Sequence, residues 1–157
     1  MSILSIIFKH VFFMVYINTS KGSKQFPCKC RSPSYSVPDD VNHLRIEDIE
    51  IIGAIGDSDT AAFAANSGGA FTYFTEYWGA SFATGIDGNW RTHPTLANML
   101  RACNRGIIGG SKGSDSAIFP DNEGRGLNVA VSGDWAGGAP AQARELLKRM
   151  RYMDDRK

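Results

Sequence analysis

The chain has 157 residues, the length of a single domain, and 43% of them are hydrophobic, which excludes a disordered chain. Its formal net charge of +1 leaves no electrostatic footprint for nucleic acid. Basic residues gather only between Lys148 and Lys157, where they fit a solvated helix face. No nucleic-acid partner is therefore expected.

The first 22 residues have the order of a secretory signal peptide. Lys9 and His10 precede an apolar run at 11–17, and small polar residues follow at 18–22, where a peptidase would cut. A membrane anchor is the alternative, but the uninterrupted apolar run of seven residues is far shorter than the roughly 20 needed to span a bilayer. A mis-started or cytosolic N-terminus is a third alternative. We predict a secreted, extracellular chain.

Residues 23–40 form a predicted linker, because three prolines and four serines interrupt any periodicity there. This segment holds Cys28 and Cys30, which are separated by one residue and are badly placed to pair with each other. One of them could reach Cys103, which would leave an odd thiol, and the sequence leaves the pairing open. No Cys-x-x-Cys and no histidine cluster accompanies them, so neither a metal site nor a cofactor is predicted.

The domain proper is predicted over 41–157, and its most informative part is a strand that leads into a Gly-Asp-Ser turn. Residues 49–55 are apolar apart from Glu50, which is typical of an interior parallel strand. An Ala-rich, helix-like segment follows the turn, so Ser58 is predicted at a helix N-terminus, where backbone N–H groups favour a developing negative charge. Acyl-transfer enzymes expose nucleophilic serines on such turns, although Gly-Asp-Ser also makes an ordinary turn or helix cap.

Three further elements are predicted in the second half of the chain. Residues 94–102 have the apolar spacing of a short helix with proline in its first turn, and 126–131 is a short strand. Residues 139–153 are the clearest helix, with an apolar stripe along one face. Strands that alternate with helices predict an α/β fold with a parallel sheet.

No strand follows this last helix, and two strands make a poor sheet. The sequence therefore looks like the first part of a domain. We expect Ile51, Ile52, Val129 and Val131 to lie in strands that lack neighbours, so that the chain exposes apolar surface.

Seven segments together resemble the phospholipase B group of GDSL-type (SGNH) lipases and esterases, in the order and spacing of the opening half of that family's domain. The series covers roughly residues 26 to 153. Its pieces are Phe-Pro-Cys at 26–28, the entry segment 41–49, Ile-Gly-Asp-Ser-Asp-Thr at 55–60, Gly-Ile-Asp-Gly-Asn at 85–89, the segment 92–100, Leu-Asn-Val-Ala-Val-Ser-Gly at 127–133 and Ala-Pro-Ala-Gln at 139–142.

The resemblance implies the first strands and helices of an SGNH-hydrolase-like three-layer sandwich, and it implies roles for three residues. Ser58 matches the nucleophile, and its backbone together with that of Gly133 matches the oxyanion hole. A glycine after a strand lets the backbone approach a reacting atom closely. Asp57 belongs to the same motif and is expected to organise the turn rather than transfer protons.

Other parts of the family's site have no match in these residues. Its later Gly-x-Asn-Asp segment would supply an oxyanion-hole asparagine, and its Asp-x-x-His segment would supply the base and the acid that orients it. His93 is the one candidate for a substitute base, against a structural or surface role. Asp59 stands where the family has an apolar residue, and it brings a negative charge near the developing oxyanion.

The expected function is a secreted serine ester hydrolase of the phospholipase B or lipase type. It would act on phospholipid or other carboxylic esters, with contact to a membrane surface, and would be truncated and inactive as this chain alone. The alternative is a non-catalytic secreted remnant, or a lipid- or partner-binding module of the same fold. An unrelated α/β binding protein is a third hypothesis.

Overall fold

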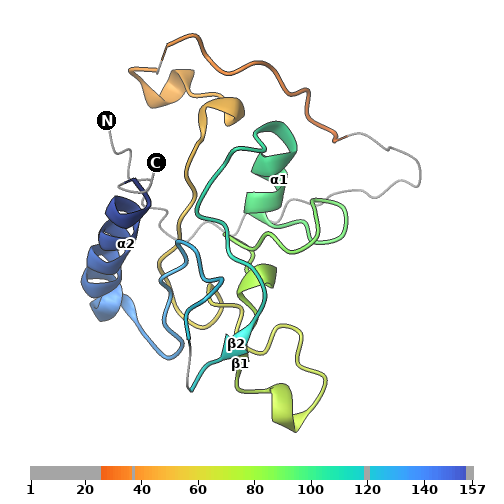
Figure 1. Cartoon of the computed structure of the whole chain (residues 1–157), viewed down its shortest axis with the longest axis vertical. Coiled ribbons are helices and arrows are strands. Elements are labelled where there is room, and N and C mark those ends of the chain that lie inside the picture. The colour runs from red at the N-terminus through yellow and green to blue at the C-terminus, as the bar shows by residue number, and fades with distance from the viewer. Residues whose placement is uncertain (1–25, 37, 119–120, 155–157) are drawn as a thin grey trace.

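The computed structural model describes residues 26–36, 38–118 and 121–154, which form a mixed α/β structure (Figure 1). The predicted signal peptide lies outside these residues. No helix in the described ranges is both long and apolar enough to cross a bilayer. The elements in chain order are η1 (Val41–His43), η2 (Ile46–Asp48), η3 (Ala70–Thr72), β1 (Thr75–Glu76), η4 (Trp78–Ala80), α1 (Leu96–Cys103), β2 (Asp115–Ser116), η5 (Ala136–Gly138) and α2 (Ala139–Asp154).

Both predicted longer helices are confirmed. The helix α1 begins two residues later than predicted, because Thr95 and not Pro94 starts it: the Thr95 hydroxyl accepts the N–H of Asn98 at 3.1 Å and caps the first turn. The helix α2 covers the predicted range. In the view of Figure 1 these two helices flank the extended middle of the chain.

The two predicted parallel strands are reduced to isolated bridges. Ile51 pairs in parallel with Ile108, and Ala54 pairs in parallel with Asn128. Because the segment 50–56 changes partner within three residues, neither partner accompanies it far enough to build a continuous ladder. The named sheet in the described residues is instead antiparallel and joins β1 to β2. The mixed α/β class is thus confirmed, whereas the expected parallel sheet is not.

The helix predicted after Ser58 is wrong. One helical hydrogen bond forms, from the N–H of Ala61 to the carbonyl of Asp57 at 3.0 Å, and the residues that follow are turns. Ala62 and Ala64 are left-handed, with φ of 56° and 57°, which no continuing α-helix permits. The chain bends there because Phe63 pairs antiparallel with Glu76 in β1. Tertiary pairing therefore overrides the helix propensity of the alanines.

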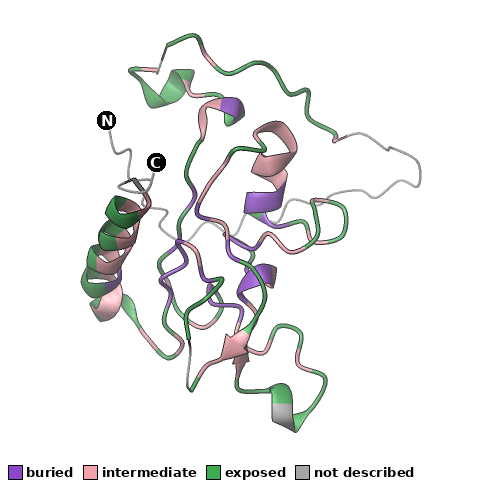
Figure 2. Ribbon diagram, viewed as in Figure 1, coloured by how far each residue is buried: buried purple, intermediate pink, exposed green. Residues whose placement is uncertain are grey.

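The hydrophobic core is small and lies in the middle of the molecule (Figure 2). Its largest members are Trp78 and Leu127, and alanines fill much of the rest. Of the four apolar residues expected on exposed strands, Ile51 and Val131 are exposed. Ile52 and Val129 are buried, as alternation along extended segments requires.

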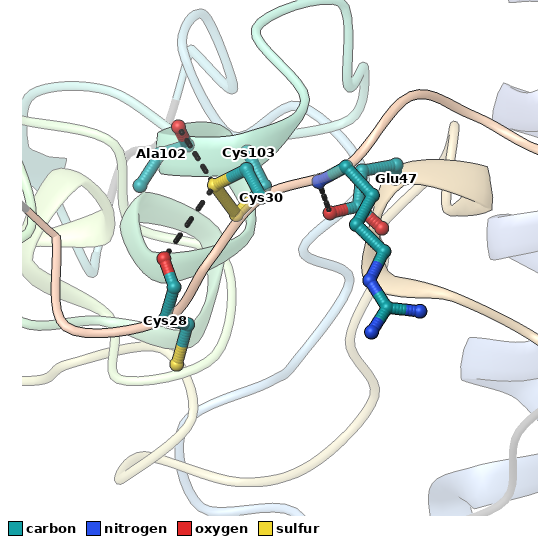
Figure 3. The surroundings of a disulfide bond; sticks show 6 residues. Cys28, Cys30, Glu47, Ala102 and Cys103 are labelled. Carbon is teal, nitrogen blue, oxygen red and sulfur yellow. Dashed lines mark hydrogen bonds between the residues drawn. A yellow bond between two sulfur atoms is a disulfide. The ribbon is translucent and has the colours of Figure 1, made fainter.

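A disulfide joins the N-terminal segment to α1. Cys30 and Cys103 are bonded across 73 positions of sequence, and Cys28 is an exposed free thiol (Figure 3). The structure thus settles the pairing that the sequence left open. The sulfur of Cys28 points away from the disulfide in Figure 3.

Two carboxylates of η2 fasten the same N-terminal segment. Glu47 accepts the backbone N–H of Arg31 at 2.6 Å, and this bond lowers the pKa of Glu47. Asp48 accepts the N–H of Ser34 at 2.6 Å and its hydroxyl at 2.8 Å, and the backbone bond is the main cause that lowers the pKa of Asp48.

These depressed pKa values predict an acid-labile attachment of residues 31–34. A carboxylate whose pKa is lower in the folded state stabilises the fold above its unfolded pKa, and that contribution is lost as pH falls through the folded pKa. The amide proton shifts of Arg31 and Ser34 should therefore titrate with midpoints below 4.5 and 3.8, the ordinary values of Glu47 and Asp48. Glu47→Gln and Asp48→Asn serve as controls and should remove each titration in turn. Midpoints at or above the ordinary values would contradict the attachment.

Candidate functional site

Ser58 lies in a tight polar turn that its neighbour Asp57 organises. The Asp57 carboxylate accepts the N–H of Asp59 at 3.1 Å, a local bond that closes an Asx turn. The N–H of Phe63 binds the Ser58 carbonyl at 2.9 Å. Ser58 is half-buried, and no other described residue makes a hydrogen bond to its hydroxyl or to its backbone N–H. Its reactive groups are therefore not committed to holding the turn.

Backbone pairing brings Gly133 to the same end of the molecule as Ser58. The N–H of Val129 donates to Ala54 at 2.9 Å, and the N–H of Val131 donates to Gly56 at 3.2 Å. Ser58 lies two residues after Gly56, and Gly133 lies two residues after Val131. The sequence-predicted pair is thus placed on adjacent loops.

Gly133 has the properties that an oxyanion-hole glycine needs. Its φ of 84° is left-handed, a conformation that glycine adopts without strain, and a Cβ there would meet only open space. Within the described residues, no acceptor takes up its N–H. The N–H groups of Ser58 and Gly133 are therefore two unused donors on neighbouring loops.

Gln142 in α2 connects the two loops. Its side-chain oxygen accepts the N–H of Gly56 at 2.8 Å, and its amide nitrogen donates to the carbonyl of Gly56 at 2.9 Å. The same nitrogen donates to the carboxylate of Asp134 at 2.6 Å. One buried side chain thus binds both the residue two before Ser58 and the residue directly after Gly133.

Glu76 holds the other flank of the Gly133 loop. Its carboxylate accepts the hydroxyl of Ser132 at 2.6 Å and the indole N–H of Trp78 at 2.7 Å. Arg125 lies 3.6 Å from the same carboxylate, and its guanidinium sits 4.9 Å from the centre of the Trp78 ring. Burial lowers the pKa of Arg125, and the charge of Glu76 opposes that shift.

A buried polar network supports the far end of the Ser58 turn. The side-chain amide of Asn128 donates to the Thr60 carbonyl at 2.9 Å and to the Thr84 hydroxyl at 3.1 Å. The Ser81 hydroxyl also donates to the Thr60 carbonyl, at 2.7 Å. Two hydrogen bonds thus fix the position of Thr60, which lies two residues after Ser58. They hold the end of the turn in place.

In the described ranges, no base makes a hydrogen bond to Ser58. His93 is half-buried, and its ring nitrogen Nδ1 lies 3.4 Å from the hydroxyl of its neighbour Thr92, its side-chain partner among the described residues. Serine is a weak nucleophile without an adjacent base. Asp59, the charged residue beside Ser58, is exposed, so solvent screens its carboxylate.

The potential metal ligands that gather in the described ranges, and the hollow along the N-terminal segment, both lie away from this turn. In the described ranges, the three potential ligands that gather are Cys30, Glu47 and Cys103, but the two sulfurs are bonded to each other and offer no thiolate. A shallow hollow of about 710 Å³ lies along the N-terminal segment, and its lining includes His43 and Arg45 but no residue of the Ser58 turn.

Sequence reasoning gave no role to the residues that hold the two loops. Gln142 is a polar residue on the apolar stripe of its helix, between Ala139 and Leu146. A polar residue on a buried face indicates a hydrogen-bond partner inside the protein. Glu76 is the lone charge between Asp59 and Asp87, in a segment rich in aromatic residues. A charge in such a setting usually has a buried partner.

Gly56 leaves no room for a side chain, so Gly56→Ala should destabilise the chain. An added Cβ would lie 2.2 Å from the Thr60 hydroxyl oxygen and 2.7 Å from the Thr60 Cβ, and Thr60 is buried. We expect a loss of about 1–3 kcal/mol in the free energy of unfolding, measured by urea denaturation. Gly68→Ala is the matched control, because a Cβ there meets nothing within 4 Å. Equal stability of the two variants would contradict the packing at Gly56.

Comparison with known proteins shows related sequences in mammals. The chain is 41% identical over 126 residues to "Phospholipase B1, membrane-associated" of Mus musculus, and 40% identical over 126 residues to the proteins of that name from Rattus norvegicus and Homo sapiens. The matches cover 79–80% of this chain but 8% of each relative's length. No protein-family model and no solved structure matches the chain. The chain therefore contains a phospholipase B-like region.

Proposed function

We propose that this chain carries the nucleophile half of a GDSL-type serine ester hydrolase that acts on phospholipid or other carboxylic esters. The observation that carries the proposal is the placement of Ser58 and Gly133 on adjacent loops, with a free hydroxyl and two backbone N–H groups that bind nothing else in the described residues. The sequence similarity to phospholipase B1 supports a lipid ester as the substrate. The incomplete three-layer sandwich with a parallel sheet belongs to this proposal, and the parallel bridges of Ala54 and Ile51 support it.

In the proposed reaction, the Ser58 hydroxyl attacks the ester carbonyl, and a base takes its proton. The carbonyl oxygen becomes an oxyanion that the N–H groups of Ser58 and Gly133 stabilise, a contribution of about 3–4 kcal/mol per donor in other enzymes. The base then returns the proton to the departing alcohol, and water releases the acyl group from Ser58. The base and its orienting acid come from sequence outside these 157 residues. Asp57 shapes the turn and transfers no proton.

One observation favours a second candidate, a non-catalytic lipid- or partner-binding module. No described base contacts Ser58, and loss of a triad member reduces turnover by orders of magnitude. This candidate keeps the same fold without the chemistry.

Ester hydrolysis distinguishes the two candidates. We expect little or no turnover of a short-chain ester or a lysophospholipid by residues 23–157, and turnover by a gene product that extends this segment with the missing base. Ser58→Ala in the extended protein should lower kcat by a factor of about 10⁴ or more, because the covalent step is lost. Activity that survives Ser58→Ala would remove the hydrolase assignment, and robust activity of residues 23–157 would show that the base lies within them. In that case, loss of this activity in His93→Ala would identify His93 as the base.

We also propose that the chain is secreted and acts at a membrane surface. The disulfide between Cys30 and Cys103 supports this, because disulfides persist in oxidising compartments. The printed name of the relatives includes "membrane-associated". N-terminal sequencing of protein recovered from the medium should begin between residues 18 and 23, and a sequence that begins at Met1 would refute signal cleavage.

A further inference from the structure

We propose that Gln142 is a positioning residue that sets the Ser58 turn against the Gly133 loop, an inference that rests on the proposed function. Within the described residues, the side chain of Gln142 makes no hydrogen bond to Ser58 or Gly133. It acts through Gly56 and Asp134, which lie two residues before the nucleophile and one residue after the oxyanion-hole glycine.

The contacts of Gln142 use both ends of its amide. The side-chain oxygen accepts from the Gly56 N–H, and the nitrogen uses its two protons for the Gly56 carbonyl and the Asp134 carboxylate. The Gly56 carbonyl also accepts the N–H of Val131. The two peptide groups that flank Gly56 therefore carry one bond between the extended segments and two bonds to α2, which fixes the position of Gly56 in two directions.

Among the twenty side chains, few match this arrangement. The position needs one acceptor and two donors on one planar group, at the end of a stem long enough to leave the helix. Glutamate would place oxygen against the Gly56 carbonyl and the Asp134 carboxylate, and leucine would leave all three groups without a partner. Gln142 is buried, so water does not substitute for these bonds.

The three hydrogen bonds of Gln142, which we call the clamp, affect the separation of the two proposed oxyanion donors. Oxyanion stabilisation requires two donors at a fixed separation, and a shift of about 1 Å costs about 100-fold in rate. Ser58 and Gly133 belong to different segments, so their separation depends on what joins the two loops. Gln142 is the described side chain that bonds to both.

The variant Gln142→Glu tests the clamp without reference to catalysis. In the 157-residue chain at pH 7, the protection of the Gly56 and Val131 amides against hydrogen exchange should fall about 10-fold. Acidification should restore much of this protection, because the protonated carboxyl donates to Asp134. Other charged groups near this site are Asp57 in the turn and Glu145 one helical turn along, which is paired with Lys148 and Arg149. Ala141→Glu adds the same charge at the neighbouring exposed position and should leave protection unchanged.

Catalysis provides the second measurement. If Gln142 only stabilised the fold, its substitution would leave the kcat of the folded enzyme unchanged. In the extended protein, Gln142→Glu should lower kcat about 100-fold with little change in KM at pH 7, and lower pH should recover part of kcat relative to the unsubstituted protein. Gln142→Leu should show the same loss without recovery by acid. The control Ala141→Glu should keep full activity.

The outcomes separate this proposal from the proposed function. Unchanged protection in Gln142→Glu, or lower protection with unchanged kcat, overturns the positioning role. If Ser58→Ala leaves ester hydrolysis intact, the hydrolase assignment fails, and the pH-dependent protection of Gly56 alone then decides whether Gln142 sets the two loops. If Gln142→Leu does not fold, the acid recovery of Gln142→Glu decides the question.

Discussion

The buried amide of Asn128 is the interaction on which the rest of the structure depends. Most of the fully buried large side chains of this core are polar: Asn128, Thr84, Ser81 and Ser111 accompany Trp78 and Leu127. A buried polar group without a partner costs about 1–3 kcal/mol, so such a core holds only when its hydrogen bonds close. Asn128 closes them by bonding to Thr60, Ser81 and Thr84 at once. The network continues through Ser111 to the carbonyl of Arg125.

This network ties the Ser58 turn to the core, although Asp57 and Asp59 in the turn are exposed. Thr60 is held by Asn128 and Ser81, and Gly56 is held by Gln142, so the turn is anchored on both sides of the serine. The Gly133 loop is fastened in the same way, by Ser132 to Glu76 and by Asp134 to Gln142. Ser58 and Gly133 lie between these anchors, and within the described residues no acceptor takes up their backbone N–H groups. A rigid frame around unused donors is what electrostatic stabilisation of an oxyanion requires.

The acyl transfer that we propose needs two groups of residues, and they depend on different parts of the fold. The proposed nucleophile and oxyanion donors, Ser58 and Gly133, depend on local turns and on one pair of extended segments. Proton transfer depends on a side chain within hydrogen-bond reach of Ser58, and none of the described residues supplies it. The phospholipase B1 relatives are many times longer than this chain, which matches 8% of their length.

The sequence by itself determined the features that depend on local periodicity and on motif spacing. It predicted α1 and α2 from their apolar stripes, and it singled out Ser58 and Gly133 as the residues to examine. Tertiary structure alone decided the rest. The alanines after Ser58 favour a helix, but pairing of Phe63 with β1 bends them. Residues 50–56 have the composition of a strand, but they divide their pairing between two partners. The roles of Gln142 and Glu76 came from contacts across 86 and 56 positions of sequence, and local pattern carries no information about contacts at such separations.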